Sequence, residues 1–278
     1  MSQSINKELI LSAAKNQIET LFADITDEQI SELTNELMLI DNSNTALLYN
    51  RSIEMMNAVV NLKELMMMYS CAIKEVRTKL EILNTEYKVG YQRNPINSIY
   101  TRLKRLASVM EKLERNNIPF SLENIENNIN DVAGLRVICS YVDDIYSIAA
   151  ALKKLGGIEL VAEKDYIANP KPNGYRSLHL IINVPVFFTN QMKKMKVEVQ
   201  IRTIAMDFWA TLEHQLKYRQ QLTDGEEIAA HLKECAEIIS ATDSRMLVIR
   251  KQIEANSTEL TEEDILLEKI RKIDLPIE

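Results

Sequence analysis

Side chains able to do chemistry alternate with apolar ones in the segment KVEVQIRT, residues 196–203. In an extended strand, successive side chains point to opposite faces, so Glu198, Gln200 and Arg202 share one face. Val197, Val199 and Ile201 share the other. The pattern predicts a sheet with one apolar side and one ligand-binding side, and an ordinary solvated polar face is the alternative.

Two further groups of polar residues accompany this strand. Tyr175, Ser177 and His179 alternate in the same way, with a bend expected near Gly174. In DVAGLR, residues 131–136, Asp131 lies at the mouth of an apolar strand and Arg136 lies inside it. Strict alternation sends these two to opposite faces, so a β-bulge at Gly134 is expected to re-aim one of them. A salt bridge at a sheet edge is the structural alternative.

Phosphate is the ligand that the charge distribution suggests. Residues 91–120 hold six basic side chains and only two acidic ones, whereas the segment 222–278 has twice as many acidic as basic residues and accounts for the whole net charge of −7. A local basic site on an acidic protein favours a small polyphosphate ligand over DNA. The glycines form neither GxxxxGK[ST] nor GxGxxG, so side chains must bind the phosphates.

The elements that position these residues predict a mixed α/β class. Short runs rich in Val, Ile and Leu indicate strands at 132–140, 158–167, 176–188 and 196–203, with helices expected at 143–155 and 205–219. Apolar residues spaced four and three apart predict one long helix over 55–87 and a second helical seam over 232–253. The second seam is expected to pack against the first helix or against a copy of itself.

Location follows from what the sequence lacks. No apolar run is long enough to span a membrane, the first residues lack the pattern of a signal peptide, and Cys71, Cys139 and Cys235 form no CxxC pair. We expect a cytoplasmic protein without a membrane partner.

Four segments together resemble the synthetase domain of the RelA/SpoT superfamily, in order and spacing, and most closely the small alarmone synthetases. They are NPINSIYTRLKRLASVMEKLERN, DVAGLRVICSYVDDIY, KDYIANPKPNGYRSLHL and VEVQIRTIAMDFWATLEHQLKY. The resemblance implies a nucleotidyltransferase-like α+β fold, with a mixed sheet of about five strands flanked by helices. It also implies transfer of the β,γ-pyrophosphate of ATP to the ribose 3′-hydroxyl of GDP or GTP, which yields ppGpp or pppGpp.

The resemblance assigns the donor site and the metal. Asp131 and Glu198 match the Mg²⁺ ligands, and Glu198 also matches the group that activates the acceptor hydroxyl. Arg102, Lys104 and Lys112 match basic residues of the ATP site, and Arg102 with Arg136 resembles the pair of guanidiniums that sandwich adenine. If 104–112 is helical, Lys104, Ser108 and Lys112 share one face and line one phosphate channel.

The acceptor site is assigned in the same way. Tyr175 matches the residue on which guanine stacks, and Lys171 and His179 match ligands of the acceptor phosphates. Arg176 and Gln200 resemble supporting residues of that pocket. Asp207 stands where related synthetases often carry Asn, which leaves the base preference open.

Three regions follow: a helical extension at 1–90, the catalytic domain at 91–221, and an acidic helical region at 222–278 that we expect to form a homo-oligomer, a tetramer being favoured. The three histidines include no His-Asp dipeptide of the kind used by the superfamily's hydrolases, so synthesis alone is expected. One rival keeps the chemistry but uses adenine nucleotides or the 3′ end of tRNA as acceptor, as toxin-like relatives do. Contact with other RNA is not predicted. A second rival, a nucleotide-binding module without catalysis, is disfavoured by the paired carboxylates.

Overall fold

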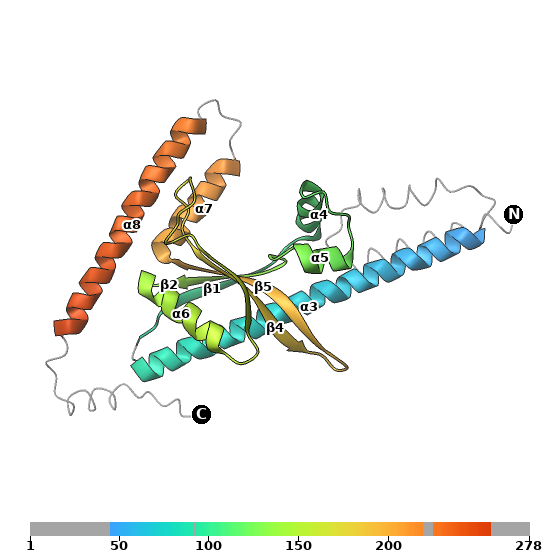
Figure 1. Cartoon of the computed structure of the whole chain (residues 1–278), viewed down its shortest axis with the longest axis horizontal. Coiled ribbons are helices and arrows are strands. Elements are labelled where there is room, and N and C mark those ends of the chain that lie inside the picture. Colours follow the sequence, from blue (N-terminus) through green and yellow to red (C-terminus); the bar gives the residue numbers. More distant parts are fainter. Residues whose placement is uncertain (1–44, 92, 219–224, 257–278) are drawn as a thin grey trace. The chain divides into compact units, whose positions relative to one another are not determined.

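The computed structural model describes residues 45–91, 93–218 and 225–256. Its elements run in the order α3 (Thr45–Tyr91), β1 (Ile96–Leu103), α4 (Leu106–Arg115), α5 (Leu122–Asn128), β2 (Ala133–Cys139), α6 (Val142–Lys154), β3 (Glu159–Asp165), β4 (Leu178–Phe187), β5 (Met192–Thr203), α7 (Ile204–Tyr218) and α8 (Gly225–Asn256) (Figure 1). This is the mixed five-stranded α+β architecture that the sequence predicts.

The chain divides into two compact units, and the division falls inside α3 between Cys71 and Ala72. Of the described residues, the smaller unit joins 45–71 with 107–129, and its buried apolar side chains come from α3, α4, α5 and the residue after α5, Ile129. Helix α5 is capped by Ser121, whose hydroxyl accepts a hydrogen bond from the backbone N–H of Asn124. The predicted boundary at residues 90–91 stays a prediction, and that at 221–222 lies outside the described residues.

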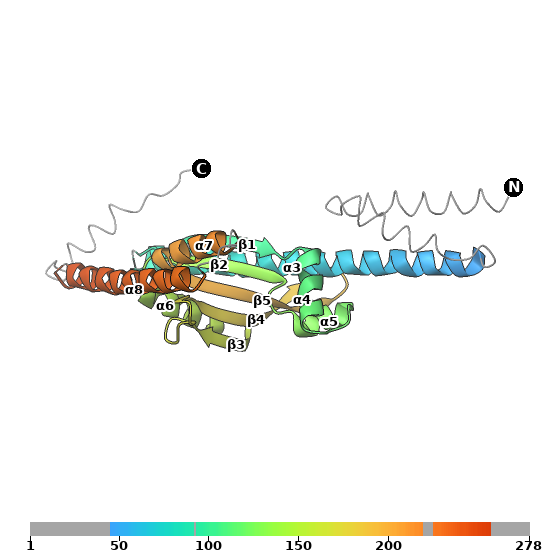
Figure 2. The ribbon, with the colours of Figure 1, turned by 90° about the horizontal axis from the view of Figure 1, so that it is seen from above.

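The larger unit contains the sheet, with strand order β1-β2-β5-β4-β3 (Figure 2). The strands β2 and β5 pair in parallel, and the other three neighbouring pairs are antiparallel. Strand β5 is the last in sequence but the central strand of the sheet. Val197, Val199 and Ile201 are fully buried, which confirms the predicted apolar face.

Two expectations for the first two strands were wrong. Strand β2 keeps an unbroken register with β5 from Ala133 to Cys139, so Gly134 forms no bulge. Asp131 precedes the strand, and the alternation rule therefore does not apply to it. The segment around Lys104 is not helical: β1 ends at Leu103 and α4 begins at Leu106, so Lys104 does not share a helix with Ser108 and Lys112.

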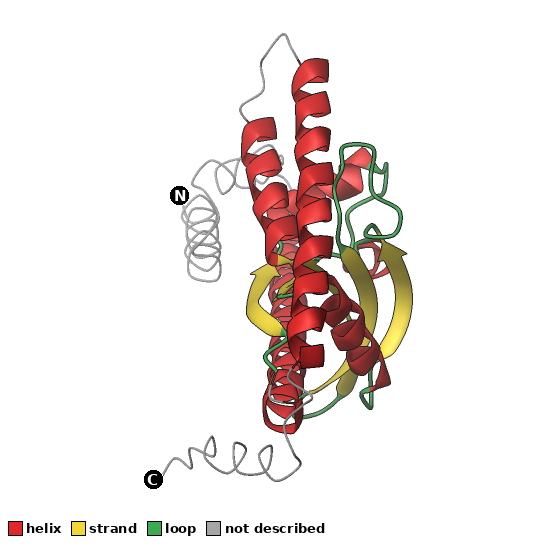
Figure 3. Cartoon of the chain, turned by 90° about the vertical axis from the view of Figure 1, so that its left-hand side faces the viewer, coloured by secondary structure: helices red, strands yellow, loops and turns green. Residues whose placement is uncertain are grey.

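The helix α8 lies beside α7 and runs back along it (Figure 3). The indole N–H of Trp209 in α7 donates to the backbone carbonyl of Leu232 in α8 at 2.8 Å. Further along α8, buried Asp243 accepts a hydrogen bond from Thr203, the last residue of β5, at 2.6 Å. These contacts fix α8 to the end of the central strand.

The predicted seam of α8 is exposed for much of its length. Cys235, Thr242, Met246, Ile249 and Ile253 are exposed, whereas Ala236 and Asp243 face the unit's interior. Leu232 and Ile239 of the same seam are half-buried and pack against the cluster of Trp209, Ala210 and Ala236, so the first part of the seam contacts its own unit. The residues from Met246 onward leave an exposed apolar stretch.

Candidate functional site

One face of the sheet collects the polar residues because paired positions on neighbouring strands point the same way. Glu198 of β5 is in register with Gly134 of β2, and Gln200 is in register with both Arg136 and His179. On the outer side, Arg102 of β1 pairs with Gly134. The register of β1, β2, β5 and β4 therefore brings Arg102, Arg136, His179, Glu198 and Gln200 to one face. The alternation predicts this arrangement for His179, Glu198 and Gln200, whereas the strand that carries Arg102 was not predicted.

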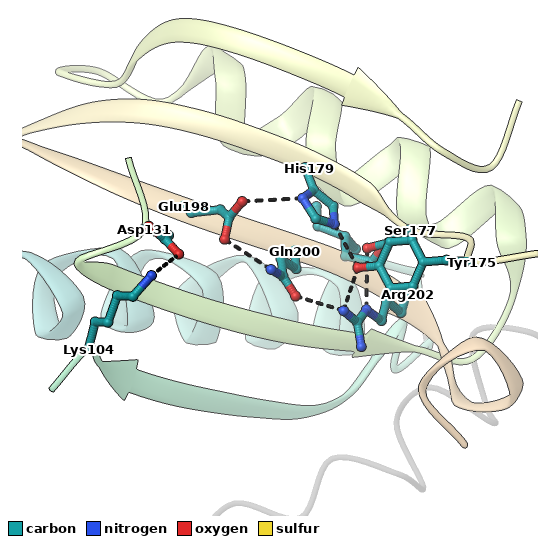
Figure 4. Close-up of polar contacts among 9 residues, drawn as sticks. Lys104, Asp131, Tyr175, Ser177, His179, Glu198, Gln200 and Arg202 are labelled. Atoms are coloured by element: carbon teal, nitrogen blue, oxygen red, sulfur yellow. Dashed lines mark hydrogen bonds and ion pairs between the residues drawn. The ribbon is translucent and has the colours of Figure 1, made fainter. Parts of the chain in front are cut away.

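Glu198 receives a hydrogen bond on each carboxylate oxygen (Figure 4). Nδ1 of His179 lies 3.2 Å from Oε1, and Nε2 of Gln200 donates to Oε2 at 2.9 Å. An ionised carboxylate only accepts hydrogen bonds, so Nδ1 of His179 must carry the hydrogen of the first contact. Both side chains thus hold Glu198 in one orientation.

The protonation equilibrium of Glu198 reflects these contacts. Burial raises its pKa, but the hydrogen bond and charge of His179 and the hydrogen bond from Gln200 outweigh burial, and the pKa lies below its ordinary value. The negative charge of Asp131 acts in the opposite direction. Glu198 is therefore a carboxylate at neutral pH, as a proton acceptor or a metal ligand must be.

Asp131 lies two residues before β2 and is held there by Lys104, which follows β1. The ammonium group of Lys104 donates to Oδ2 of Asp131 at 2.8 Å, and the backbone N–H of Lys104 bonds the carbonyl of Val132, also at 2.8 Å. Lys104 thus reaches Asp131 from the short connection between β1 and α4 instead of from a helix.

The two carboxylates fit a hard divalent cation. Asp131 and Glu198 are near enough for the charge of one to raise the pKa of the other, and carboxylate oxygens are the protein ligands that Mg²⁺ prefers. Among the described residues, no three His, Cys, Asp or Glu side chains converge on a point that could hold a metal. A pair of carboxylates matches a Mg²⁺ ion that takes its remaining ligands from phosphates and water.

Arg202 is a site residue that the sequence places on the polar face but does not single out. It is only 4% exposed, although the alternative interpretation of that face was solvation. Its guanidinium donates to the Tyr175 hydroxyl at 2.6 Å, to Oε1 of Gln200 at 2.7 Å and to Oδ1 of Asp207 at 3.2 Å. The signal that could have found it is its position four residues after Glu198 on the same face.

An aromatic cluster lies beside this network. The rings of Tyr166 and Tyr175 meet edge to face with centroids 6.0 Å apart, and His179 lies edge to face with both. The ammonium group of Lys171 is 4.6 Å from the centroid of Tyr166 and 4.8 Å from that of Tyr175. The resemblance assigns Lys171 and Tyr175 to one site, and the structure brings them together. Tyr166 was not singled out, because nothing in the predicted strand over 158–167 distinguishes it as a site residue.

Asp207 connects two arginines. Its Oδ1 is 3.2 Å from a guanidinium nitrogen of Arg136 and 3.2 Å from one of Arg202. In this arrangement the carboxylate accepts hydrogen bonds from the protein and links a predicted donor-site residue to the acceptor-site network.

Arg176 is directed away from the network. Its guanidinium donates to the backbone carbonyl of Ile167 at 3.3 Å, and its buried Nε has no hydrogen-bond partner. It fastens the segment that carries Tyr166 and Lys171 and does not touch the side chains around Glu198. Ser108 and Lys112 both lie in α4, within the smaller unit, where each is half-buried.

Within the ranges 45–91, 93–218 and 225–256, none of the helices is long and apolar enough to cross a membrane.

Residues 101–223 match the family model described as a region found in RelA/SpoT proteins. The GTP pyrophosphokinase YwaC of Bacillus subtilis is 42% identical over 192 residues, which cover 69% of this chain and 91% of that protein.

Solved structures give the same result. Small alarmone synthetase 2 of B. subtilis is 42% identical to this chain, with a TM-score of 0.63. The match covers 69% of this chain and 99% of the chain of that synthetase. Small alarmone synthetase 1 of that organism has been solved with its product pppGpp, at 36% identity and a TM-score of 0.63, covering 70% of this chain and 98% of its own. Its complex with AMPCPP gives 35% identity and a TM-score of 0.57, covering 67% and 94%.

Proposed function

This chain belongs to the RelA/SpoT family, and we propose that its polar sheet face transfers the β,γ-pyrophosphate of ATP to the 3′-hydroxyl of GDP or GTP. It is a GTP pyrophosphokinase that makes an alarmone, in line with relatives named for this activity and one solved with pppGpp. Synthesis without hydrolysis fits the relatives that the chain covers over most of their length.

The acceptor nucleotide is proposed to lie against Tyr175. A guanine base stacked on this ring gains on the order of 1–3 kcal/mol. The ammonium group of Lys171, beside the rings of Tyr166 and Tyr175, can pair with the acceptor phosphates. His179 stands between Tyr175 and Glu198 and is proposed to contact the same nucleotide.

The donor nucleotide is proposed to use the guanidiniums of Arg102 and Arg136. They lie on neighbouring strands and on the same face, because Arg136 pairs with Tyr100, two residues before Arg102. Planar guanidiniums can stack on a base. Lys104 is proposed to bind the ATP phosphates, and the same role for Ser108 and Lys112 stays a prediction from the resemblance.

Asp131 and Glu198 are proposed to hold Mg²⁺. When bound, Mg²⁺ would neutralise phosphate oxygens and so lower the cost of bringing an anionic acceptor to ATP. The carboxylate of Glu198 can accept the proton of the 3′-hydroxyl, since it is ionised and oriented by His179 and Gln200.

The observation that carries the proposal is the doubly hydrogen-bonded Glu198 beside Asp131 on a face lined with cationic side chains. The test incubates γ-labelled ATP and Mg²⁺ with GDP, GTP, ADP or deacylated tRNA, and separates the products by thin-layer chromatography. Label should move to ppGpp or pppGpp, and Glu198→Ala should reduce the rate by at least about a hundredfold.

The exposed pair Arg77 and Glu81 on α3 offers a matched control, because Glu81→Ala removes a carboxylate that pairs on its own helix only. Label that moves to ADP or tRNA alone would contradict the guanosine acceptor. The toxin-like alternative gains no support from relatives named for GTP.

A homo-oligomer is the proposed assembly, with a tetramer favoured and the exposed seam of α8 as its contact. Because ATP and GTP are cytoplasmic nucleotides, the cytoplasm is the proposed location.

A further inference from the structure

Arg202 has more polar side-chain partners than any other residue of the network in Figure 4. Besides Tyr175, Gln200 and Asp207, its Nε donates to the hydroxyl of Ser177 at 3.3 Å. A guanidinium with only 4% exposure is costly unless its donors are satisfied. Four side chains therefore accept hydrogen bonds from Arg202, and three of them, Tyr175, Gln200 and Asp207, belong to the proposed site of the acceptor nucleotide.

The hydrogen bonds form a closed ring in which two arms connect Arg202 to Glu198, one through Tyr175 and His179 and the other through Gln200. Arginine can only donate, so the Tyr175 hydroxyl accepts from Arg202. When His179 is neutral and its hydrogen is on Nδ1, the hydroxyl hydrogen of Tyr175 can point toward Nε2, 2.8 Å away. His179 then contacts one oxygen of Glu198. On the other arm, Gln200 accepts from Arg202 and donates to the second oxygen.

Arg202 determines the direction of both arms. Without it, the amide of Gln200 could turn over, because its oxygen and nitrogen occupy nearly the same space. The Tyr175 hydroxyl could likewise donate elsewhere. Either change would leave Glu198 with a misdirected or missing donor.

We propose that Arg202 is a positioning residue for the acceptor side of the reaction: it fixes the Tyr175 hydroxyl and the Gln200 amide, and through them the orientation of Glu198. The inference rests on the proposed function. It makes no claim that Arg202 touches either nucleotide.

A purely structural arginine is the competing explanation, and Arg250 provides the comparison. Arg250 is also largely buried, and its guanidinium pairs with Asp143 and stacks on Tyr141. Removing a structural arginine lowers the fraction of folded enzyme, which reduces kcat and leaves both KM values unchanged. Loss of a positioning arginine should instead raise the KM for GDP and lower kcat.

The test is a double-mutant cycle between Arg202→Met and Tyr175→Phe, measured as kcat/KM for GDP. Tyr175→Phe removes only the hydroxyl and keeps the ring. In the parent protein we expect it to lower kcat/KM about tenfold, and in the Arg202→Met background by less than about twofold, because the hydroxyl has already lost its direction. The KM for ATP should change by less than about twofold. Effects that simply multiply would overturn the proposal.

Arg250→Met combined with Tyr175→Phe is the control, and there the effects should multiply. If Arg202→Met does not fold, as judged by thermal denaturation, the cycle is run between Tyr175→Phe and Gln200→Met. The ring predicts that this double variant loses less than the product of the single losses, since either change alone opens the ring. Multiplying effects here would equally overturn the proposal.

The same double-mutant cycle is then measured by calorimetry, as the dissociation constant of GDP in the absence of ATP. No ppGpp can be made under these conditions. Coupled dissociation constants in a protein that forms no ppGpp would refute the proposed function and support the role of Arg202. Synthesis of ppGpp without coupling in either measurement would refute the role of Arg202 alone.

Discussion

Asp207 illustrates how a single residue can serve both nucleotides. Its carboxylate touches Arg136, which is proposed to bind ATP, and Arg202, which is part of the acceptor network. Arg136 is 41% exposed on its side chain and Arg202 only 5%, so the contact with Arg202 is the stronger of the two.

Asp207→Ala is therefore expected to raise the KM for both ATP and GDP, by up to about tenfold for GDP and less for ATP. Initial rates measured with each nucleotide varied in turn provide the two constants. If Asp207 acted only by reading the guanine base, the KM for ATP would stay at its parent value. Asp207→Asn, which keeps one acceptor oxygen, should restore part of the loss.

The residues on β5 and β4 could be predicted from the sequence because alternation needs only a strand. Glu198, Gln200 and His179 lie on one face as expected. The prediction of a helix for the segment at Lys104 was wrong, because the polar residues Lys104, Ser108 and Lys112 fit a helical spacing, and this spacing does not exclude a helix that begins only at Leu106. The burial of Arg202 could not be predicted either, since it depends on Tyr175 and Asp207, which are brought in by other elements.

At the scale of the elements, the contact between α8 and the turn before β4 connects this helix to the proposed site of the acceptor nucleotide. Gly174 has φ +90°, and a Cβ placed there would lie 2.6 Å from the Cβ of Ala236 on α8. The turn also carries Lys171 and Tyr175, and Lys171 accepts a backbone hydrogen bond from Gly174 at 2.8 Å. Only glycine satisfies both the backbone conformation and the close approach of the helix.

Gly174→Ala should lower the free energy of unfolding by about 1–3 kcal/mol and raise the KM for GDP, since the turn must shift away from α8. Chemical denaturation and GDP titration measure the two effects. Ala236→Gly in the same chain should relieve the clash and recover part of the KM effect. The backbone strain at position 174, where φ is +90°, would remain. The new glycine at position 236 would add a cost of about 1 kcal/mol, because it lies within a helix. Equal KM values for parent and Gly174→Ala would contradict the connection.

Within the whole molecule, the exposed seam of α8 is the feature that the chain's own larger unit leaves uncovered. Met246, Ile249 and Ile253 are 49%, 41% and 62% exposed. Apolar side chains at this spacing are typical of a helix that packs against another helix.

The double variant Met246→Asp, Ile249→Asp should dissociate the proposed homo-oligomer, because burying two charges in an apolar seam carries a large free-energy penalty. Light scattering at micromolar concentration should report several times the chain mass of 31.9 kDa for the parent and a smaller mass for the variant. Phe187→Asp, which changes a side chain 79% exposed at the end of β4, is the matched control and should keep the parent mass. A parent protein of monomeric mass would contradict the assembly.

The central position of β5 has a consequence for how the enzyme acquires activity during synthesis on the ribosome. β5 emerges after all the other strands, yet it fills the space between β2 and β4. Until then, each of those strands lacks its neighbour on that side, and pairing β2 with β5 joins residues far apart in sequence, which slows folding. Because Asp131 precedes β2 and Glu198 lies on β5, the proposed carboxylate pair forms only after β5 has joined the sheet, and we expect catalysis to begin only then.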